Sequence, residues 1–448
     1  MSLPPDSIIV DRLVKTFPND RLRTLARETG VIQRDGGKLA ADALFWTLTL
    51  GFVTGHYRTL EEFRQEYINT CGGTLSYAAF HDWFTDALCE FLRAVLESAL
   101  DDLDGQEDRL QGRFEQFREV FIVDTTVITL YQSLLGVYPG FGDDHAGAKV
   151  HVVEAVSSGL PAEVTITDAR THESTQLETG SWVENALLLF DQAYFDYRTM
   201  DLIDANDGWF LTRLKPDANP TITAELRTWR GNAIALEGNQ LQTVLDDLYR
   251  DVIDVEGEVG FKRRIYAGTR SQAEATFRVV GLWNDDAERY HLYITNLPAE
   301  EFSPADLSML YRARWEVELL FRELKRVYGL DEITSSKPAV VKALILIGLL
   351  SLVVSRTLRE LFIDIVDHHA DETDATDDSE GASLLPRERW ARAFSRWSGR
   401  ILRLVAERLG FEPPSVVRAL LNDALDPNQH RRGLLEQVEH EPFGTDLA

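Results

Sequence analysis

Residues 119–130 read EVFIVDTTVITL, a run of apolar and β-branched side chains with a carboxylate, Asp124, in its middle. The run predicts a strand near the centre of a sheet, because its apolar residues fill both faces. An unpaired carboxylate in such a strand is costly unless it meets a cation. Asp124 is therefore a candidate cation ligand, and the alternative of a turn or helix-capping acid fits it poorly.

The segments that follow predict an α/β fold. Two further strands, at 148–155 and 162–168, come after short links rich in turn-forming residues, which indicates an antiparallel meander. The order of three strands, helix, strand, helix, strand is that of an RNase H-like core, in which the first and fourth strands lie side by side. The remaining predicted elements are a helix at about 173–186, a buried strand at 186–190, a helix near 193–205 and a strand at 208–214.

A second carboxylate, Asp191, lies where the buried strand 186–190 gives way to a helix. Helix capping is a good alternative explanation for this residue. The RNase H-like order nevertheless places Asp191 beside Asp124, which makes the two a candidate pair. The rival carboxylates lie in or beside turns, where Asp is common for local backbone reasons; they are Asp143, Asp144 and Asp168.

Residues 311–325 read YRARWEVELLFRELK, with polar side chains three, four and seven residues apart. On one α-helix these side chains all fall within about 40° of the central carboxylate. A carboxylate surrounded by phenol, guanidinium and ammonium donors suits a divalent metal beside phosphate. A surface helix with spaced ion pairs is the alternative, but it does not predict the two upstream aspartates. The residues concerned are Tyr311, Arg314, Glu318, Arg322 and Lys325.

The spacing between Asp191 and Glu318 exceeds what one helix and one strand need. The excess, about 216–290, alternates polar and β-prone residues and predicts a β-rich insertion, in which Trp283 is a candidate for DNA contact or for ordinary sheet packing. Two short helices near 59–68 and 75–84 suit either a helix-turn-helix or a helical hairpin. The predicted domains are a helical N-terminal DNA-binding region at 1–115, the core at 116–215 and 291–345, the insertion at 216–290, and a helical C-terminal region at 346–448 with an acidic linker at 367–383.

Composition sets limits on location and partners. A formal net charge of −27 argues against nucleic-acid binding by the chain as a whole, but local charge matters more than the sum. The basic residues are 38 arginines and only eight lysines. An acidic, lysine-poor surface is expected in a cytosol of very high salt, so we hypothesise a halophilic source, an archaeon. Two cysteines, no signal peptide after Met1 and no apolar run longer than 343–354 predict a cytoplasmic protein without membrane association.

The spacing Tyr-x2-Arg-x3-Glu-x6-Lys at 311–325 resembles the signature of the IS-four family of DDE insertion-sequence transposases. The resemblance extends over about 116–345 and includes the segments around Asp124 and Asp191. Relatives often carry glycine where this chain has Ala193, a difference that leaves the carboxylate in place. The resemblance implies an RNase H-like core with a β-rich insertion, and cut-and-paste transposition of DNA.

The resemblance also implies roles for the candidate residues. Two Mg²⁺ ions, for which Mn²⁺ can substitute, would be held by three hard carboxylates: Asp124, Asp191 and Glu318. Phosphates of the transposon end would be fixed by Tyr311, Arg314 and Lys325, with Arg322 as a fourth contact, and a flipped base would be gripped by Trp283. The implied partners are double-stranded DNA, as terminal inverted repeats and target, and a second protomer in a synaptic complex.

Two other functions stay open at this point. A metal-dependent nuclease on the same fold would use the same acids without strand transfer. An inactive DNA-binding relative would keep the fold and lose metal dependence, although the presence of all three acids in the sequence weighs against it.

Overall fold

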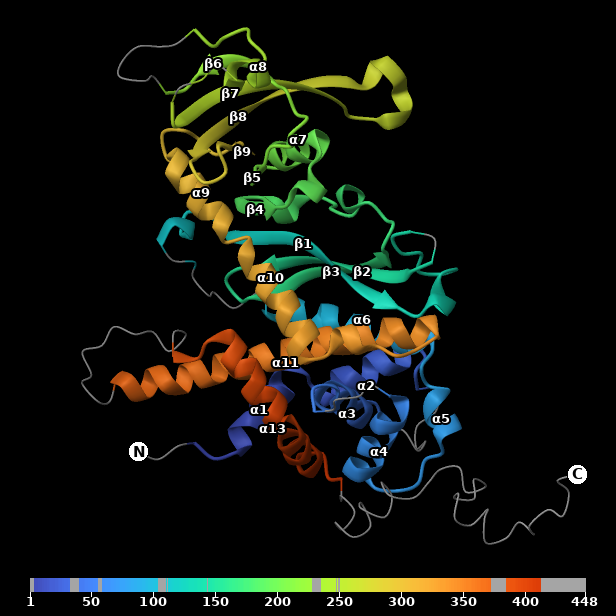
Figure 1. Cartoon of the computed structure of the whole chain (residues 1–448). Helices are drawn as coiled ribbons and strands as arrows, with labels where there is room; N and C mark the ends of the chain where they lie inside the picture. The colour runs from blue at the N-terminus through green and yellow to red at the C-terminus, as the bar shows by residue number, and fades with distance from the viewer. Residues whose placement is uncertain are drawn as a thin grey trace, which may run out of the picture.

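The computed structural model describes residues 4–32, 40–54, 59–103, 110, 112–142, 144–227, 235–246, 248, 250–371 and 384–411. A nine-stranded mixed sheet, in the order β3-β2-β1-β4-β5-β9-β8-β7-β6, is stacked on a layer of helices (Figure 1). The strands are β1 (Glu119–Leu130), β2 (Ala146–Ala155), β3 (Leu160–Asp168), β4 (Ala186–Phe190), β5 (Trp209–Arg213), β6 (Thr221–Glu225), β7 (Val252–Lys262), β8 (Gln272–Asn284) and β9 (Arg289–Thr295).

The first five strands form the α/β core. β1 pairs antiparallel with β2 and parallel with β4, while β5 pairs parallel with β4. β1 is therefore central, as predicted from its two apolar faces, and its first five residues are all buried. The predicted order of these strands is confirmed. Its consequence is that the middle of β1 and the carboxyl end of β4 are neighbours in the sheet.

The helix predicted at about 173–186 is wrong. Only two short 3₁₀ turns form there, Glu173–Thr175 and Ser181–Val183. Gly180 between them is fully extended, and the Thr175 hydroxyl donates to the backbone carbonyl of His172. Serine, threonine and glycine favour such local arrangements over a continuous helix, which explains the difference.

The segment 216–290, predicted to be β-rich, supplies β6, α8 (Leu241–Asp246), β7 and β8. These strands continue the core sheet, because β9 pairs antiparallel with both β5 and β8. Arg278 in β8 is buried and bonded through two nitrogens to Asp254 of β7, both at 2.8 Å. The insertion and the core therefore share one sheet, and the predicted domain boundaries stay predictions.

The helical layer is centred on α11. This helix touches α1, α3 and α6 on one side and β3 on the other, and lies between the sheet and the N-terminal helices (Figure 1). Residues 338–368 are long and apolar enough to cross a membrane, but 83% of their most apolar window is buried inside the protein. The helices are α1 (Ser7–Thr16), α2 (Asn19–Glu28), α3 (Ala41–Phe52), α4 (Leu60–Cys71), α5 (Tyr77–His81), α6 (Asp86–Leu103), α7 (Tyr197–Ala205), α9 (Pro304–Arg312), α10 (Trp315–Arg322), α11 (Pro338–Asp371) and α13 (Arg387–Arg408).

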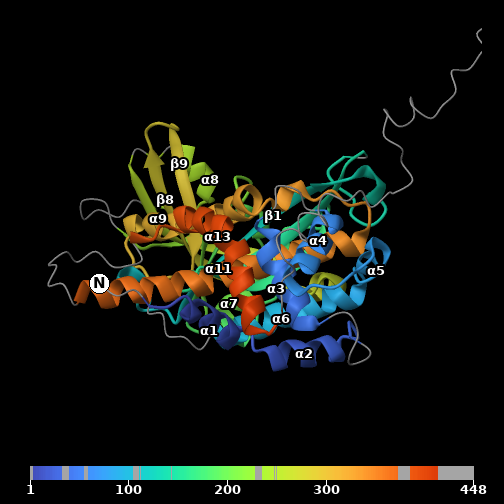
Figure 2. The same ribbon diagram turned by 90° about the horizontal axis from the view of Figure 1, so that it is seen from below.

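The N-terminal and C-terminal helices pack together. α13 lies along α3 and also touches α1 and α4 (Figure 2). The predicted helices near 59–68 and 75–84 correspond to α4 and the shorter α5, and a helix-turn-helix role for them stays a prediction. Most of the predicted acidic linker 367–383, and every position after 411, lies outside the described residues.

Candidate active site

Asp124 lies in the middle of β1, opposite Val152 of β2. Its carboxylate accepts a hydrogen bond from its neighbour Thr125 N at 2.7 Å, and the side chain is 16% exposed. Burial is the largest influence on this group and raises the pKa of Asp124 to about 6, with the charges of Asp191 and Glu318 adding to the rise. The hydrogen bond from Thr125 and the charge of Arg314 lower the pKa and offset this rise only in part.

Asp191 directly follows β4. The parallel register pairs Val123 with Phe190, so the next position on each strand is an acid. The carbonyl of Asp191 accepts from Tyr194 N at 3.0 Å, which closes the 3₁₀ turn Gln192–Tyr194. The sheet thus places the two predicted aspartates side by side, as the strand order required.

Glu318 approaches this pair from α10, which packs on β1. Its side chain is 36% exposed, and it is linked to Asp124 by the guanidinium of Arg314. Arg314 Nη1 lies 2.8 Å from Asp124 Oδ2, and Arg314 Nη2 lies 2.9 Å from Glu318 Oε1. One arginine therefore joins the carboxylates of β1 and α10.

The continuous helix predicted over 311–325 is wrong in detail. α9 ends at Arg312, and the chain tightens through i to i−3 bonds from Ala313 N, Arg314 N and Glu316 N around the start of α10. Residues 323–327 then widen into a π-turn, where Tyr328 N reaches back to the carbonyl of Glu323 at 3.1 Å.

The buried side chain of Glu323 explains the π-turn. This carboxylate accepts from Arg356 Nη2 at 2.6 Å and from the Tyr328 hydroxyl at 2.9 Å, and all three side chains are buried. A buried charge is stable only with partners, so the backbone adjusts to bring Glu323 to Arg356. Sequence reasoning missed this pair, since spacing along one helix says nothing about a partner on α11.

The residues at the two ends of the segment 311–325, Tyr311 and Lys325, are engaged within the protein. Lys325 donates to the Val127 carbonyl of β1 at 2.8 Å, and burial lowers its pKa. Tyr311 is 7% exposed, and burial raises its pKa to about 12. Arg322 differs from both, because it is 44% exposed and only approaches Glu388 of α13 at 3.9 Å.

A cavity of about 920 Å³ opens beside these residues. Trp283, 40% exposed at the end of β8, lines it together with Asp191, Tyr311 and Arg314. The structure thus places Trp283, the candidate for base contact, in the same cavity as Asp191 and as Tyr311 and Arg314, the two predicted phosphate ligands. Arg213 of β5, which sequence reasoning missed, also lines it.

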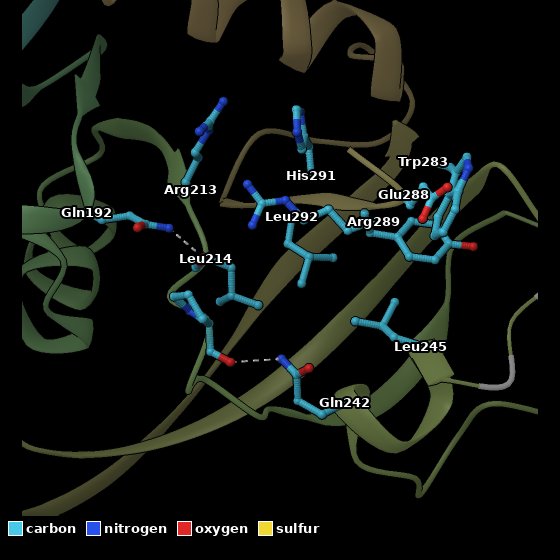
Figure 3. Close-up of a pocket in the computed structure, with 12 residues that line it drawn as sticks. Gln192, Arg213, Leu214, Gln242, Leu245, Trp283, Glu288, Arg289, His291 and Leu292 are labelled. Atoms are coloured by element: carbon cyan, nitrogen blue, oxygen red, sulfur yellow. Dashed lines mark hydrogen bonds between the residues drawn. The ribbon is translucent and has the colours of Figure 1, made fainter. Parts of the chain in front are cut away.

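Arg213 also faces a second cavity of about 520 Å³ between the β8–β9 hairpin and α8. Figure 3 shows Arg213 and His291 near one another and Trp283 further along the hairpin. The Arg213 guanidinium lies 5.6 Å from the Tyr311 ring centroid, within cation–π range. Arginine at the end of a strand carries no sequence signal by itself, so only the pairing of β5 with β9 reveals its position.

A buried hydrogen-bond network reaches the backbone of Asp124 from β2 and β3. The Tyr194 hydroxyl lies 3.4 Å from the Asp124 carbonyl oxygen and 3.1 Å from His151 Nδ1, while His151 Nε2 lies 2.9 Å from Thr167 Oγ1. Burial lowers the pKa of His151 to about 4, so this ring is neutral at neutral pH. The rival Asp168 accepts from Thr171 and closes a local turn, while Asp143 lies outside the described residues.

The donor chemistry of the three acids fits a hard divalent cation. In the arrangement described, however, Arg314 lies between Asp124 and Glu318. Within the described parts of the chain, no three His, Cys, Asp or Glu side chains are grouped closely enough to hold a metal ion. Cation binding by all three acids therefore requires the Arg314 guanidinium to move.

Comparison with known proteins places the chain in a family. The transposase DDE domain model matches residues 115–354. The transposase for insertion sequence element IS231F of Bacillus thuringiensis subsp. israelensis is 20% identical over 300 residues, which cover 59% of this chain and 62% of that protein. The transposase for insertion sequence element IS421 of Escherichia coli is 36% identical over 74 residues, which cover 16% of this chain and 20% of that protein.

Among solved structures, a cryo-EM structure of the piggyBac transposase synaptic complex with hairpin DNA aligns with a TM-score of 0.45 and 8% identity, covering 94% of this chain and 85% of that one. This chain spans less than two thirds of the length of the two insertion-sequence transposases above. The family model nevertheless covers more than half of the 448 residues, including Asp124, Asp191 and Glu318. The chain belongs to the transposase DDE domain family.

Proposed function

We propose that this protein cuts the ends of an insertion sequence and joins them to target DNA, in the cut-and-paste manner of the IS-four family on an RNase H-like core. One observation carries the proposal: adjacent parallel strands bring Asp124 and Asp191 together, and α10 presents Glu318 to them through Arg314. Membership of the DDE family supports it.

The three acids are proposed to hold Mg²⁺, as two ions for which Mn²⁺ can substitute. Bound there, the metal would activate the attacking oxygen and stabilise the leaving oxygen of the phosphodiester. Asp124 suits this task because it is largely buried and Arg314 offsets its desolvation only in part. Glu318 is the more exposed acid and lies on a separate element, so it can adjust as the cation binds.

The basic and aromatic residues around the acids are proposed to position DNA. Arg314, released from the two carboxylates, would bind a phosphate oxygen beside the scissile bond. Tyr311 and Arg213, stacked at the wall of the larger cavity, would hold the backbone that enters it. Arg322 at the end of α10 and Lys325 in the π-turn would contact further phosphates, and Trp283 offers a ring to an unstacked base.

The wider organisation follows from the reaction. Synapsis of two ends requires two protomers, so we propose a homodimer on DNA. The N-terminal helices 1–115 are proposed to read the terminal inverted repeat. The acidic, lysine-poor composition supports a halophilic source, and equal folding and solubility in low salt and in molar potassium chloride would count against that origin.

The test is cleavage and joining of the inverted repeats that flank the gene, in the presence of a target plasmid and Mg²⁺. Asp124→Ala, Asp191→Ala and Glu318→Ala should each abolish cleavage, whereas Glu332→Ala, which removes an exposed carboxylate on the following turn, should not. Unchanged cleavage by Glu318→Ala would refute the proposed site. Cleavage without joining would identify a nuclease. DNA binding without cleavage or joining would identify an inactive relative.

A further inference from the structure

The outward face of α13 carries a line of arginines. At about 100° per residue, the other four lie within about 40° of the central Arg396. All five side chains are exposed, while the opposite face is buried against α3 and its neighbours. We call this set the α13 arginine stripe: Arg389, Arg392, Arg396, Arg400 and Arg403.

The stripe contrasts in charge with the rest of the chain. α13 contains seven arginines and two glutamates, in a protein whose formal net charge is −27. The solvent-facing positions of a helix in so acidic a chain are expected to carry carboxylates, as α6 does at Asp86, Glu90 and Glu97. Simple solvation of an amphipathic helix therefore does not account for arginine at five aligned positions.

The described residues leave most of this positive charge without a close ion pair. Arg392 pairs with Glu388 at 2.6 Å, but both side chains are more than half exposed, so the pair is weak and easily exchanged. Arg400 only approaches Asp6, at 4.0 Å. No ion pair within the described parts of the chain involves Arg389, Arg396 or Arg403.

The stripe begins next to the helix that carries Glu318. Arg387, at the start of α13, contacts Glu316 of α10 at 3.2 Å, and Glu388 lies 3.9 Å from Arg322 at the end of α10. α13 also packs on the π-turn 323–327. From Arg389 to Arg403 the stripe runs about 21 Å along the helix, the length of about six base pairs.

We infer that the α13 arginine stripe binds the phosphate backbone of double-stranded DNA as it leaves the active site, an inference that rests on the proposed function. Guanidinium groups bind phosphate oxygens bidentately, and a line of them along one helix matches a backbone better than an isolated anion. Such contacts fix register and affinity without reading sequence. Trp397, 51% exposed and 5.6 Å from the Arg400 guanidinium, adds an apolar surface beside the backbone.

The test uses the salt dependence of DNA binding by the full chain. Affinity for a short duplex of arbitrary sequence is measured by fluorescence anisotropy over a potassium chloride series in which the wild type stays folded. The triple variant Arg389→Gln/Arg396→Gln/Arg403→Gln should lower the slope of log affinity against log salt by about 2 to 3, since each lost phosphate contact removes about 0.9.

A matched control lies on the same helix. Arg408 is 64% exposed but points about 120° away from the stripe, so Arg408→Gln should leave the slope unchanged. Unfolding temperature and oligomeric state are measured for each variant. Exposed arginines contribute little to folding, so the triple variant should unfold at the wild-type temperature.

The outcomes separate this inference from the proposed function. If the triple variant shows the wild-type slope while the wild type cleaves inverted repeats, the inferred role of the stripe in DNA binding is wrong and the proposed function stands. A changed oligomeric state with an unchanged slope overturns it in favour of an acidic surface on a second copy. A wild type that neither binds nor cleaves DNA refutes the proposed function and this inference together.

Discussion

The signature segment 311–325 and the α13 arginine stripe carry almost the same pattern, polar side chains within about 40° of one line on a helix, yet they have opposite environments. In the signature segment, Arg314 bonds to two carboxylates and Lys325 to a backbone carbonyl. In the α13 arginine stripe the five arginines face solvent. The same spacing therefore occurs with partnered and with solvent-facing side chains, so spacing alone does not distinguish the proposed catalytic site from the proposed DNA-binding surface.

The largest expected difference between the two regions is in catalysis. Glu318→Gln removes a proposed metal ligand and should reduce DNA cleavage roughly a thousandfold or more, as loss of a catalytic group does. Arg396→Gln in the stripe should lower DNA affinity only several-fold and leave the cleavage rate of bound DNA unchanged. Single-turnover cleavage with saturating enzyme separates these effects. Equal losses of cleavage rate would show that the two helices do not differ in role.

The second difference is in stability. Arg356→Met leaves Glu323 charged and buried without its cation, which should lower the free energy of unfolding by about 3 to 5 kcal/mol. Arg408→Met, on the exposed side of α13, should change it by less than about 0.5 kcal/mol. Denaturant unfolding measures both. The double variant Glu323→Gln/Arg356→Met should recover part of the loss, and no recovery would contradict the buried-pair explanation of the π-turn.

The third difference is in pH dependence. Glu154 of β2 is 1% exposed, and burial raises its pKa from 4.5 to about 7 even with Arg387 nearby. Because the folded state holds this proton more tightly, the associated stability is fully present below pH 4.5 and is lost as pH rises through about 7, a change of up to about 3 kcal/mol.

Glu154→Gln cannot ionise, so its unfolding free energy should vary less between pH 4.5 and 8 than that of the wild type. Urea unfolding at a series of pH values and constant salt makes the comparison. Glu407→Gln, an exposed acid on α13, is the control and should keep the wild-type profile. Parallel curves for wild type and Glu154→Gln would rule out this titration.

The smallest expected difference concerns two arginines. Arg314→Gln removes the cation shared by Asp124 and Glu318 and should cost about 1 to 3 kcal/mol in the absence of metal, whereas Arg396→Gln should stay within about 0.5 kcal/mol. Thermal unfolding is then repeated with Mg²⁺. If the cation and Arg314 compete for the same carboxylates, Mg²⁺ should raise the unfolding temperature of Arg314→Gln more than that of wild type, and an equal rise in both would exclude the competition.

Much of the fold and part of the site could be predicted from residue pattern. The apolar run around Asp124 and the buried run before Asp191 identify two strands, because strand period and turn chemistry are local properties. Their neighbouring positions were expected from the order of elements in an RNase H-like core. The helix predicted at about 173–186 failed since Gly180 and the hydroxyl side chains favour turns. The β-rich character of 216–290 was predicted, but its continuation of the core sheet depends on the pairing of β9 with β5.

By itself, the sequence determined which residues are available: one aspartate within a buried strand, a second directly after another buried strand, and a glutamate among phosphate-seeking donors on a following helix. The tertiary structure decided how they are used. It put Arg314 between Asp124 and Glu318, widened the helix at Glu323 to reach Arg356, and left the α13 arginines in solvent. The physical reason is that spacing fixes direction around a helix, whereas the free energy of a charge depends on burial and on partners distant in the chain.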